Sequence, residues 1–303
     1  MIECPEVVVE GVAAVVGERT VENAATVKPE VIAATGFPVR RVVAEGTTLF
    51  DLSLRAARQL VGSAKADAIG GVIAATFSHE NRFPALSVRL AASLGLSPET
   101  AAFDVQMACS AYPYALYLAG RLVADTGKKV LVVDGDIQSR LSQTAATGTA
   151  ELFSDAATAT LVSVGHGEPS DFAFLSRASD ALACSAEGPI QMDGFKVFAF
   201  VATEVAKLLK PFCVKPFAAF VPHQANMYMV RQLAKALNVE DRLVTCGADV
   251  ANPGSCSVPL ALARKGRAGE RVLIAGFGAG FSASAGIVRL ADSFKGIVGD
   301  DLK

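Results

Sequence analysis

Short apolar runs alternate along the chain with stretches whose apolar residues recur every three or four positions. Runs of strand length lie at residues 68–77, 103–107, 130–134, 217–221 and 272–275. Between the second and third runs, apolar residues from Ala111 to Val123 recur at steps of three and one, the spacing of one helix face, and Gly127 ends the pattern. Strands separated by helices of this length predict parallel pairing through crossover helices, and therefore an α/β fold.

The second half of the chain repeats this plan. A helical face at residues 227–237 follows the strand at 217–221, and a glycine-rich turn leads into a return strand at 282–290. A similar return strand at 158–164 closes the first half. The break near residues 165–171 therefore predicts two duplicated halves, one spanning 1–166 and the other 167–303. No low-complexity or proline-rich linker separates them, so we expect the halves to pack as one unit.

Composition and charge exclude several classes of protein. Of the 303 residues 51% are hydrophobic, which excludes a disordered chain. The net charge of −2 and the lack of a basic block argue against nucleic-acid binding. Apolar or glycine stretches such as Val272 to Phe281 are far shorter than the ~20 residues of a membrane helix. The N-terminus does not resemble a signal peptide, and the six cysteines contain no CxxC pair, so we expect a reduced, cytoplasmic protein.

Cys109 is the first candidate catalytic residue. It follows the strand at 103–107 and precedes a helix whose first turn contains Pro113. A thiol at a helix start lies near unpaired N–H groups, so its pKa is predicted to fall below the ~8.5 of a free cysteine. The small residues Ser110 and Ala111 leave room for an incoming thioester. The alternative is a buried cysteine that acts only as a small hydrophobic residue.

His223 and Asn252 are the next candidates. His223 stands in Pro222-His223-Gln224-Ala225-Asn226, just past one strand and just before a helix, where a rigid element would fix its ring. A purely structural, hydrogen-bonding histidine remains the alternative. Asn252 opens an Asn-Pro-Gly sequence, for which an ordinary turn is the alternative. No His, Cys and carboxylate cluster has the spacing of metal ligands.

The glycine-rich segment Gly276–Gly280 offers a different kind of chemistry. Gly278 to Ala283 matches G-x-G-x-x-A, but the 20 residues that follow are too few for a dinucleotide-binding unit. A glycine turn between strands can instead present a backbone N–H group to an oxyanion. The chain contains no G-x-S-x-G, P-loop or H-E-x-x-H motif, which leaves serine hydrolase, NTPase and zinc protease without support.

In this order, the segments resemble the β-ketoacyl-acyl-carrier-protein synthase III family of the thiolase superfamily. The sequence Pro222–Asn226 agrees with the family's histidine motif letter for letter. Supporting similarity lies at residues 103–111, 152–159, 252–259 and 277–280, and at Thr35-Gly36 with Arg40-Arg41. The resemblance implies a thiolase-like fold of two fused halves in five layers, α-β-α-β-α, with the site where the halves meet.

The resemblance also implies a chemistry for these residues. Cys109 would take an acyl group from an acyl-CoA or acyl-carrier-protein thioester, and the backbone N–H groups of Cys109 and Ala279 would stabilise the oxyanion. His223 and Asn252 would donate hydrogen bonds to the thioester carbonyl of malonyl-acyl carrier protein as CO2 leaves. Phe277 would lie beside the malonyl carboxylate. No cofactor is expected, and the resemblance implies a homodimer in which the segment around Phe83 helps to wall the partner's tunnel.

Departures from the family pattern point to a specialised pathway or an unusual primer. The chain has no tryptophan, residues 180–193 look shortened, and the remaining departures are Ala34, Ser154, Ala156, Ala199 and Tyr228. Two other functions stay open: acyl transfer without condensation, against which Asn252 argues, and a subunit of a heterodimeric condensing enzyme. A biosynthetic thiolase would need a second cysteine in the glycine loop. His79-Glu80 could supply a glutamate base or could be a solvated or subunit-contact loop.

Overall fold

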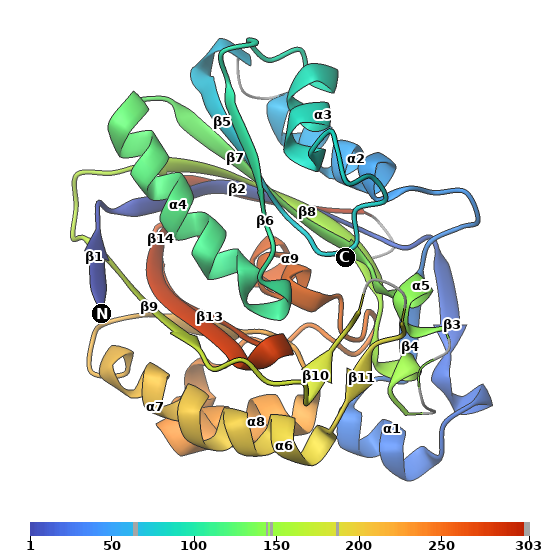
Figure 1. The fold of residues 1–303 in the computed structure, drawn as a ribbon. Coiled ribbons are helices and arrows are strands. Elements are labelled where there is room, and N and C mark those ends of the chain that lie inside the picture. Colours follow the sequence, from blue (N-terminus) through green and yellow to red (C-terminus); the bar gives the residue numbers. More distant parts are fainter. Residues whose placement is uncertain (63–65, 144, 146–147, 186–187, 300–303) are drawn as a thin grey trace.

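The fold is a layered α/β structure built around one branched sheet (Figure 1). A computed structural model describes residues 1–299 apart from 63–65, 144, 146–147 and 186–187. Its strands are β1 (Ile2–Cys4), β2 (Val7–Val16), β3 (Arg19–Glu22), β4 (Val39–Val42), β5 (Ile69–Ala75), β6 (Ala101–Val105), β7 (Lys129–Ile137), β8 (Asp155–Val164), β9 (Ser170–Ser176), β10 (Leu182–Ala183), β11 (Gln191–Met192), β12 (Ala219–Pro222), β13 (Arg271–Gly278) and β14 (Ser282–Val298). Its α-helices are α1 (Pro29–Thr35), α2 (Leu49–Val61), α3 (Leu86–Ser93), α4 (Ala111–Thr126), α5 (Gln138–Ser142), α6 (Gly194–Phe200), α7 (Ala206–Leu209), α8 (Met227–Leu237) and α9 (Ser257–Lys265).

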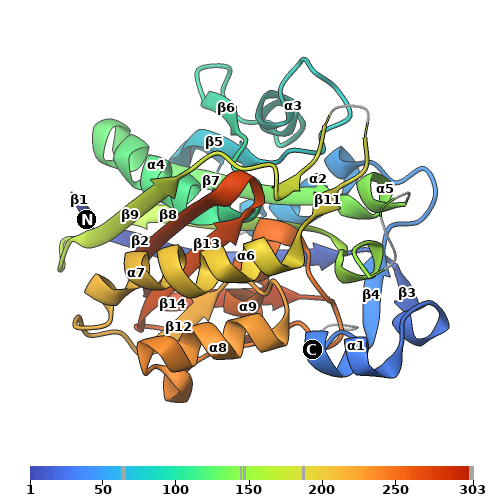
Figure 2. The ribbon, with the colours of Figure 1, turned by 60° about the horizontal axis from the view of Figure 1, so that its bottom comes forward.

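Five layers follow from how the helices cover the two parts of this sheet. One part runs β2-β8-β7-β5-β6, and the other contains β9, β14, β13 and β12. Helices α4 and α9 lie between the two parts, α2 and α3 cover the outer face of the first, and α6, α7 and α8 cover the outer face of the second (Figures 1 and 2). Three apolar clusters fill the spaces between these layers. The predicted five-layer α-β-α-β-α order is confirmed.

Strand pairing follows the predicted plan. β6 and β7 both pair in parallel with β5, and α4 makes the crossover between them. β12 pairs in parallel with β13, while the two return strands, β8 and β14, pair antiparallel with β7 and β13. Gly127 ends α4 in the left-handed conformation with φ 68°, as the sequence predicts.

The return strand β14 is longer than its apolar pattern predicts. It continues past residue 290 to Val298 and pairs in parallel with β2, with a break in register between Leu290 and Lys295. The bulged strand bends there and continues along β2 from the first part of the sheet. The two halves thus share one continuous sheet, and the division at residues 166 and 167 stays a prediction.

The backbones of the two halves come close together where β13 passes the segment after β6. A Cβ atom at Gly276 would lie 2.8 Å from both the Cys109 carbonyl oxygen and the Ser110 Cα. Only glycine lets the two backbones come this close. This contact sets the distance between the Cys109 backbone and strand β13 in the second part of the sheet.

We therefore predict that Gly276→Ala lowers the free energy of unfolding by about 1–3 kcal/mol, because the added methyl group must push two backbones apart. Gly194→Ala is the matched control, since a Cβ there meets nothing within 4 Å. Urea unfolding followed by circular dichroism measures both variants. Equal stability of the two would show that the strand can move away from the Cys109 segment without cost.

Candidate active site

Cys109 lies at the turn that joins β6 to α4. Residues Ala108–Ser110 form a single 3₁₀ turn, and α4 begins at Ala111. Ala108 adopts a left-handed conformation with φ 42°, which is uncommon for a residue with a side chain. The turn leaves the Cys109 side chain only 5% exposed. Strand, turn and helix together hold the thiol in one place.

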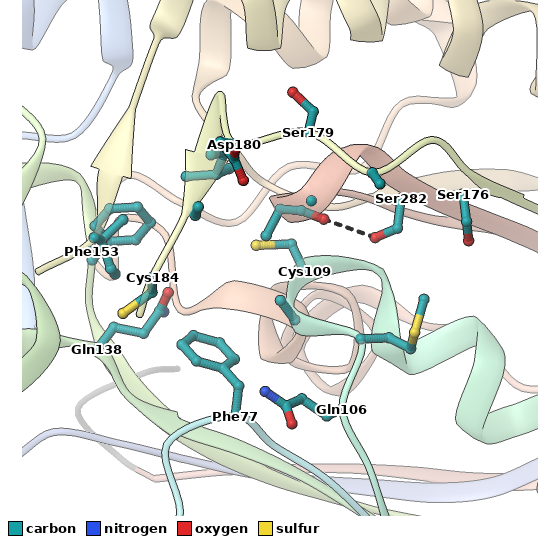
Figure 3. Close-up of a pocket in the computed structure, with 18 residues that line it drawn as sticks. Phe77, Gln106, Cys109, Gln138, Phe153, Ser176, Ser179, Asp180, Cys184 and Ser282 are labelled. Carbon is teal, nitrogen blue, oxygen red and sulfur yellow. Dashed lines mark hydrogen bonds between the residues drawn. The ribbon is translucent and has the colours of Figure 1, made fainter. Parts of the chain in front are cut away.

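Two cavities meet at Cys109. The larger, about 560 Å³, extends past Gln106, Gln138, Phe153 and Ser282 (Figure 3). The smaller, about 80 Å³, is lined by Cys109, His223, Asn252 and Phe277 among others. The structure thus brings together the three residues predicted to be catalytic, with Phe277 beside them. Ala279 lies in the wall of the larger cavity, and its backbone N–H group forms a hydrogen bond with the Cys109 sulfur.

His223 is held by contacts on both its backbone and its ring. Its N–H group donates to the carbonyl of Ala275 on β13 at 2.7 Å. The ring Nδ1 lies 2.8 Å from the hydroxyl of Ser257, which also accepts the Gln224 N–H at 3.1 Å. A hydroxyl that accepts from Gln224 can donate its own proton to Nδ1, and the ring proton then sits on Nε2. Ser257 is a positioning residue that the sequence analysis missed.

The imidazole of His223 is neutral at neutral pH. It is fully buried, and the loss of hydration lowers the pKa of His223 to about 4, although a hydrogen bond with the Gly254 backbone opposes this. The edge-on ring of Phe277, at 5.5 Å between centroids, adds to the apolar surroundings. A neutral ring with its proton on Nε2 is a hydrogen-bond donor without a charge.

Asn252 has a fixed amide orientation. The N–H group of Gly254, which has φ 64°, donates to Oδ1 at 2.9 Å. The amide nitrogen is therefore the group left to donate, and it lies 3.4 Å from the carbonyl of Ala225. The turn expected from the Asn-Pro-Gly sequence is present. It orients the Asn252 side chain, so the turn and a functional role for Asn252 are compatible.

Residues from the first half of the chain hold the Asn252 backbone. Its N–H group donates to the Leu152 carbonyl at 3.0 Å, and its carbonyl accepts the Ser154 N–H at 2.9 Å. The side-chain nitrogen of Gln138 donates to the carbonyls of Ser154 and Asn252 at 3.1 and 3.2 Å. The Ser154 hydroxyl donates to the Val250 carbonyl. Ser154, a departure from the family pattern, is thus part of the contact between the halves.

The prediction that Cys109 has a lowered pKa is wrong. The pKa of Cys109 is raised to about 12, mainly by burial and also by the nearby Asp136, and the hydrogen bond from Ala279 opposes them only in part. A helix N-terminus contributes at most about 2 kcal/mol, or roughly 1.5 pKa units, which is too little to offset the loss of hydration. The resting enzyme therefore holds a protonated thiol.

Two buried carboxyl groups on β7 also escaped the sequence analysis. Burial raises the pKa of Asp136 to about 7 and raises that of Asp134 well above its ordinary value. Asp136 accepts hydrogen bonds from Thr76, Phe77 and Ser78 and so holds the loop that carries Phe77 into the larger cavity. The sequence did contain a sign of this pair, because two aspartates at alternate positions of an apolar strand point to the same side of the sheet.

The His79-Glu80 loop does not reach the site. Glu80 accepts the N–H of Leu49 at 2.7 Å, at the start of α2, and lies 3.6 Å from Arg140. Neither His79 nor Glu80 lines the cavities that meet at Cys109. Among the described residues, no three His, Cys, Asp or Glu side chains gather as metal ligands would, and none of the helices in that part of the chain has the length and apolar character to cross a bilayer.

Comparison with known proteins identifies the family. Two family models match, "3-Oxoacyl-[acyl-carrier-protein (ACP)] synthase III" over residues 103–181 and its C-terminal counterpart over residues 214–290. The chain is 34% identical over 275 residues to "Beta-ketoacyl-[acyl-carrier-protein] synthase III 2" of Streptomyces coelicolor, with 84% of this chain and 83% of that protein covered. The chain belongs to the 3-oxoacyl-[acyl-carrier-protein] synthase III family. The membership predicted from the motifs is confirmed.

Solved structures agree with this assignment to the synthase III family. The priming β-ketosynthase of the R1128 polyketide pathway is 26% identical, with a TM-score of 0.87, and the match covers 97% of this chain and 98% of that one. A 3-oxoacyl-(acyl-carrier protein) synthase from Burkholderia xenovorans has a TM-score of 0.91, with 98% and 97% covered. At 23% identity it supports the fold alone. The predicted fold class is confirmed.

The raised pKa of Cys109 gives a direct test. Only the thiolate reacts with iodoacetamide, and far below a pKa its fraction rises tenfold per pH unit. We therefore expect the alkylation rate of Cys109, measured by mass spectrometry of its peptide, to rise about tenfold per pH unit from pH 7 to 10 without a plateau. A plateau below pH 8.5 would instead support the lowered pKa expected from the helix start.

Proposed function

We propose that this synthase III homologue catalyses a decarboxylative Claisen condensation. An acyl primer held on Cys109 reacts with malonyl-acyl carrier protein to give a 3-oxoacyl-acyl carrier protein. One observation carries this proposal: Cys109, the neutral ring of His223 and the amide nitrogen of Asn252 share one small cavity. Two uncharged donors beside a nucleophilic sulfur suit a reaction in which negative charge appears on oxygen only in the transition state.

The first half-reaction loads the primer. The Cys109 sulfur attacks the carbonyl of the acyl thioester, and the backbone N–H groups of Cys109 and Ala279 stabilise the oxyanion. The new carbon–sulfur bond forms as the donor's sulfur leaves. The thiol proton ends on that departing sulfur, because the ring of His223, with its pKa lowered to about 4, holds a proton only weakly.

The second half-reaction makes the carbon–carbon bond. The malonyl group loses CO2, and the electrons of the broken bond move onto the thioester carbonyl. His223 and Asn252 donate to that oxygen and stabilise the enolate. Phe277, fully buried beside them, disfavours the malonyl carboxylate by removing its hydration. The enolate carbon then attacks acyl-Cys109, the carbon–sulfur bond breaks, and the departing Cys109 thiolate takes a proton from water to regenerate the thiol.

The proposal includes partners that follow from this chemistry. The primer arrives as an acyl-CoA or acyl-carrier-protein thioester, and the malonyl group arrives on acyl carrier protein. The thioesters supply the reactive groups, so we propose that no cofactor takes part. We place the enzyme in the cytoplasm, in fatty acid synthesis or a related specialised acyl or polyketide pathway. Ala34 and the lack of tryptophan favour carrier-bound primers over nucleotide recognition.

Substituting Asn252 separates the two half-reactions. We expect Asn252→Ala to slow malonyl decarboxylation about 10²–10³-fold, because the enolate loses one of two donors, while Cys109 is still acylated. Cys109→Ala should do the reverse and end acylation while some decarboxylation continues. The measurements are CO2 release and the intact mass of the acyl-enzyme. Decarboxylation at the parent rate in Asn252→Ala would favour the alternative function, acyl transfer without condensation.

The surface of the first half supports a dimer. β6 forms the edge of the sheet, and Phe103 on it is 38% exposed. Val88 and Phe83 are 45% and 85% exposed on the neighbouring α3 and on the loop before it. An open sheet edge beside exposed apolar side chains is a surface that natural proteins cover. We propose that a second copy of the chain covers it.

We expect the protein to sediment as a dimer at micromolar concentration, and Phe83→Lys to raise the dissociation constant at least about tenfold. Phe195→Lys is the control, since Phe195 on α6 is equally exposed at 82% but belongs to the other half. A parent protein that sediments as a monomer would argue against the homodimer and favour a heterodimeric enzyme. Equal effects of the two substitutions would place the interface elsewhere.

A further inference from the structure

Gln138 lies in the wall of the larger cavity, which of the two cavities at Cys109 is the one with room for an acyl chain. It is the first residue of α5 and is only 1% exposed. Its neighbours in the wall are largely apolar and include Phe77 and Phe153 (Figure 3). A primary amide in such a wall must be explained, because a buried polar group without a partner is costly.

The orientation of the Gln138 amide is fixed by its neighbours. The nitrogen donates to the carbonyl oxygens of Ser154 and Asn252 at 3.1 and 3.2 Å. Turning the amide over would set its oxygen against two other oxygens, so the nitrogen must occupy this place. The oxygen Oε1 is left as an acceptor, and it receives no hydrogen bond from the described residues.

The other polar groups of the cavity differ from Gln138. Ser282 is already engaged, because its hydroxyl lies 2.7 Å from that of Ser110 and donates to the Ala279 carbonyl at 3.0 Å. Gln106 is exposed. Gln138 is thus a fully buried side chain of the cavity wall with an acceptor still to be satisfied.

An unsubstituted acyl chain would fit this wall poorly. Water can reach Oε1 while the cavity is empty, but a bound chain displaces that water and leaves the oxygen without a partner. A site built to accept a hydrogen bond from a substrate discriminates against the analogue that lacks the donor, because the acceptor is then buried unpaired.

We propose that the natural primer carries a hydroxyl group on its acyl chain and that Oε1 of Gln138 accepts its hydrogen bond. The proposal rests on the condensing function above and specifies its substrate class: a hydroxyacyl thioester. Gln138 then determines primer specificity, while its nitrogen positions Asn252.

The test is a competition for Cys109 between matched thioesters. Each pair of pantetheine thioesters has one chain length, and one member carries a hydroxyl on the second, third or fourth carbon. Intact-protein mass spectrometry of the acyl-enzyme gives the ratio of the two products. We expect the parent enzyme to favour one of the hydroxyacyl members by at least about tenfold.

Gln138→Leu should abolish or reverse that preference, because an alkyl side chain favours the unsubstituted primer. The ratio is taken within one variant, so partial loss of folded enzyme cancels. Gln106→Leu makes the same change at the exposed glutamine of the cavity and should keep the parent ratio.

Three results would overturn the proposal. The first is a parent enzyme that shows no preference for any hydroxyacyl member. The second is a Gln138→Leu variant that retains the parent ratio, and the third is a Gln106→Leu variant that abolishes it. Acylation of Cys109 without discrimination would refute the primer class and leave the proposed condensation intact. A Cys109 that no thioester of either kind acylates would refute the proposed function itself.

Discussion

The geometry of the site depends on one short backbone bridge between the halves of the chain. Asn252 exchanges two hydrogen bonds with the segment Leu152–Ser154, and Gln138 reinforces the bridge from its side chain. Every group involved is buried, so each broken bond would leave an unpaired donor or acceptor. The bridge therefore fixes Asn252 relative to Cys109, although the two residues come from different halves. Neither half alone has both residues.

Burial decides the electrostatics of this site. The loss of hydration disfavours every charged form, so it raises the pKa of Cys109 and of Asp136 and lowers that of His223. The helix start beside Cys109 acts in the opposite direction, but its contribution is the smaller one. The result is a neutral thiol next to a neutral imidazole, and charge arises there only once a thioester is bound.

Much of the fold could be predicted because the spacing of apolar residues along the chain indicates its main helices and strands. The face of α4, its glycine end and the parallel strands around it follow from the sequence, as does the elbow at Cys109. The continuation of β14 along β2 could not be predicted, because residues 291–298 lack a continuous apolar run and pair with a strand about 280 residues away in the sequence. The prediction of the Cys109 pKa was wrong for a related reason. The local sequence indicates that a helix begins at the thiol, but it does not show how deeply the thiol is buried. Ser257 and Gln138 act through contacts distant in sequence, which no local pattern reveals.

Gln138 links the choice of primer to the condensation step. Its nitrogen holds the backbone carbonyl of Asn252, whereas its oxygen faces the cavity where the primer lies. Because the Gln138 amide is rigid, its oxygen and nitrogen move together. A primer that binds the oxygen therefore also affects the position of Asn252. A hydroxyl that satisfies the oxygen leaves the amide in the orientation that holds Asn252. An alkyl chain leaves the oxygen buried without a partner, while the nitrogen still donates to the Asn252 carbonyl. Discrimination at loading and positioning of the decarboxylation donor therefore depend on the same side chain.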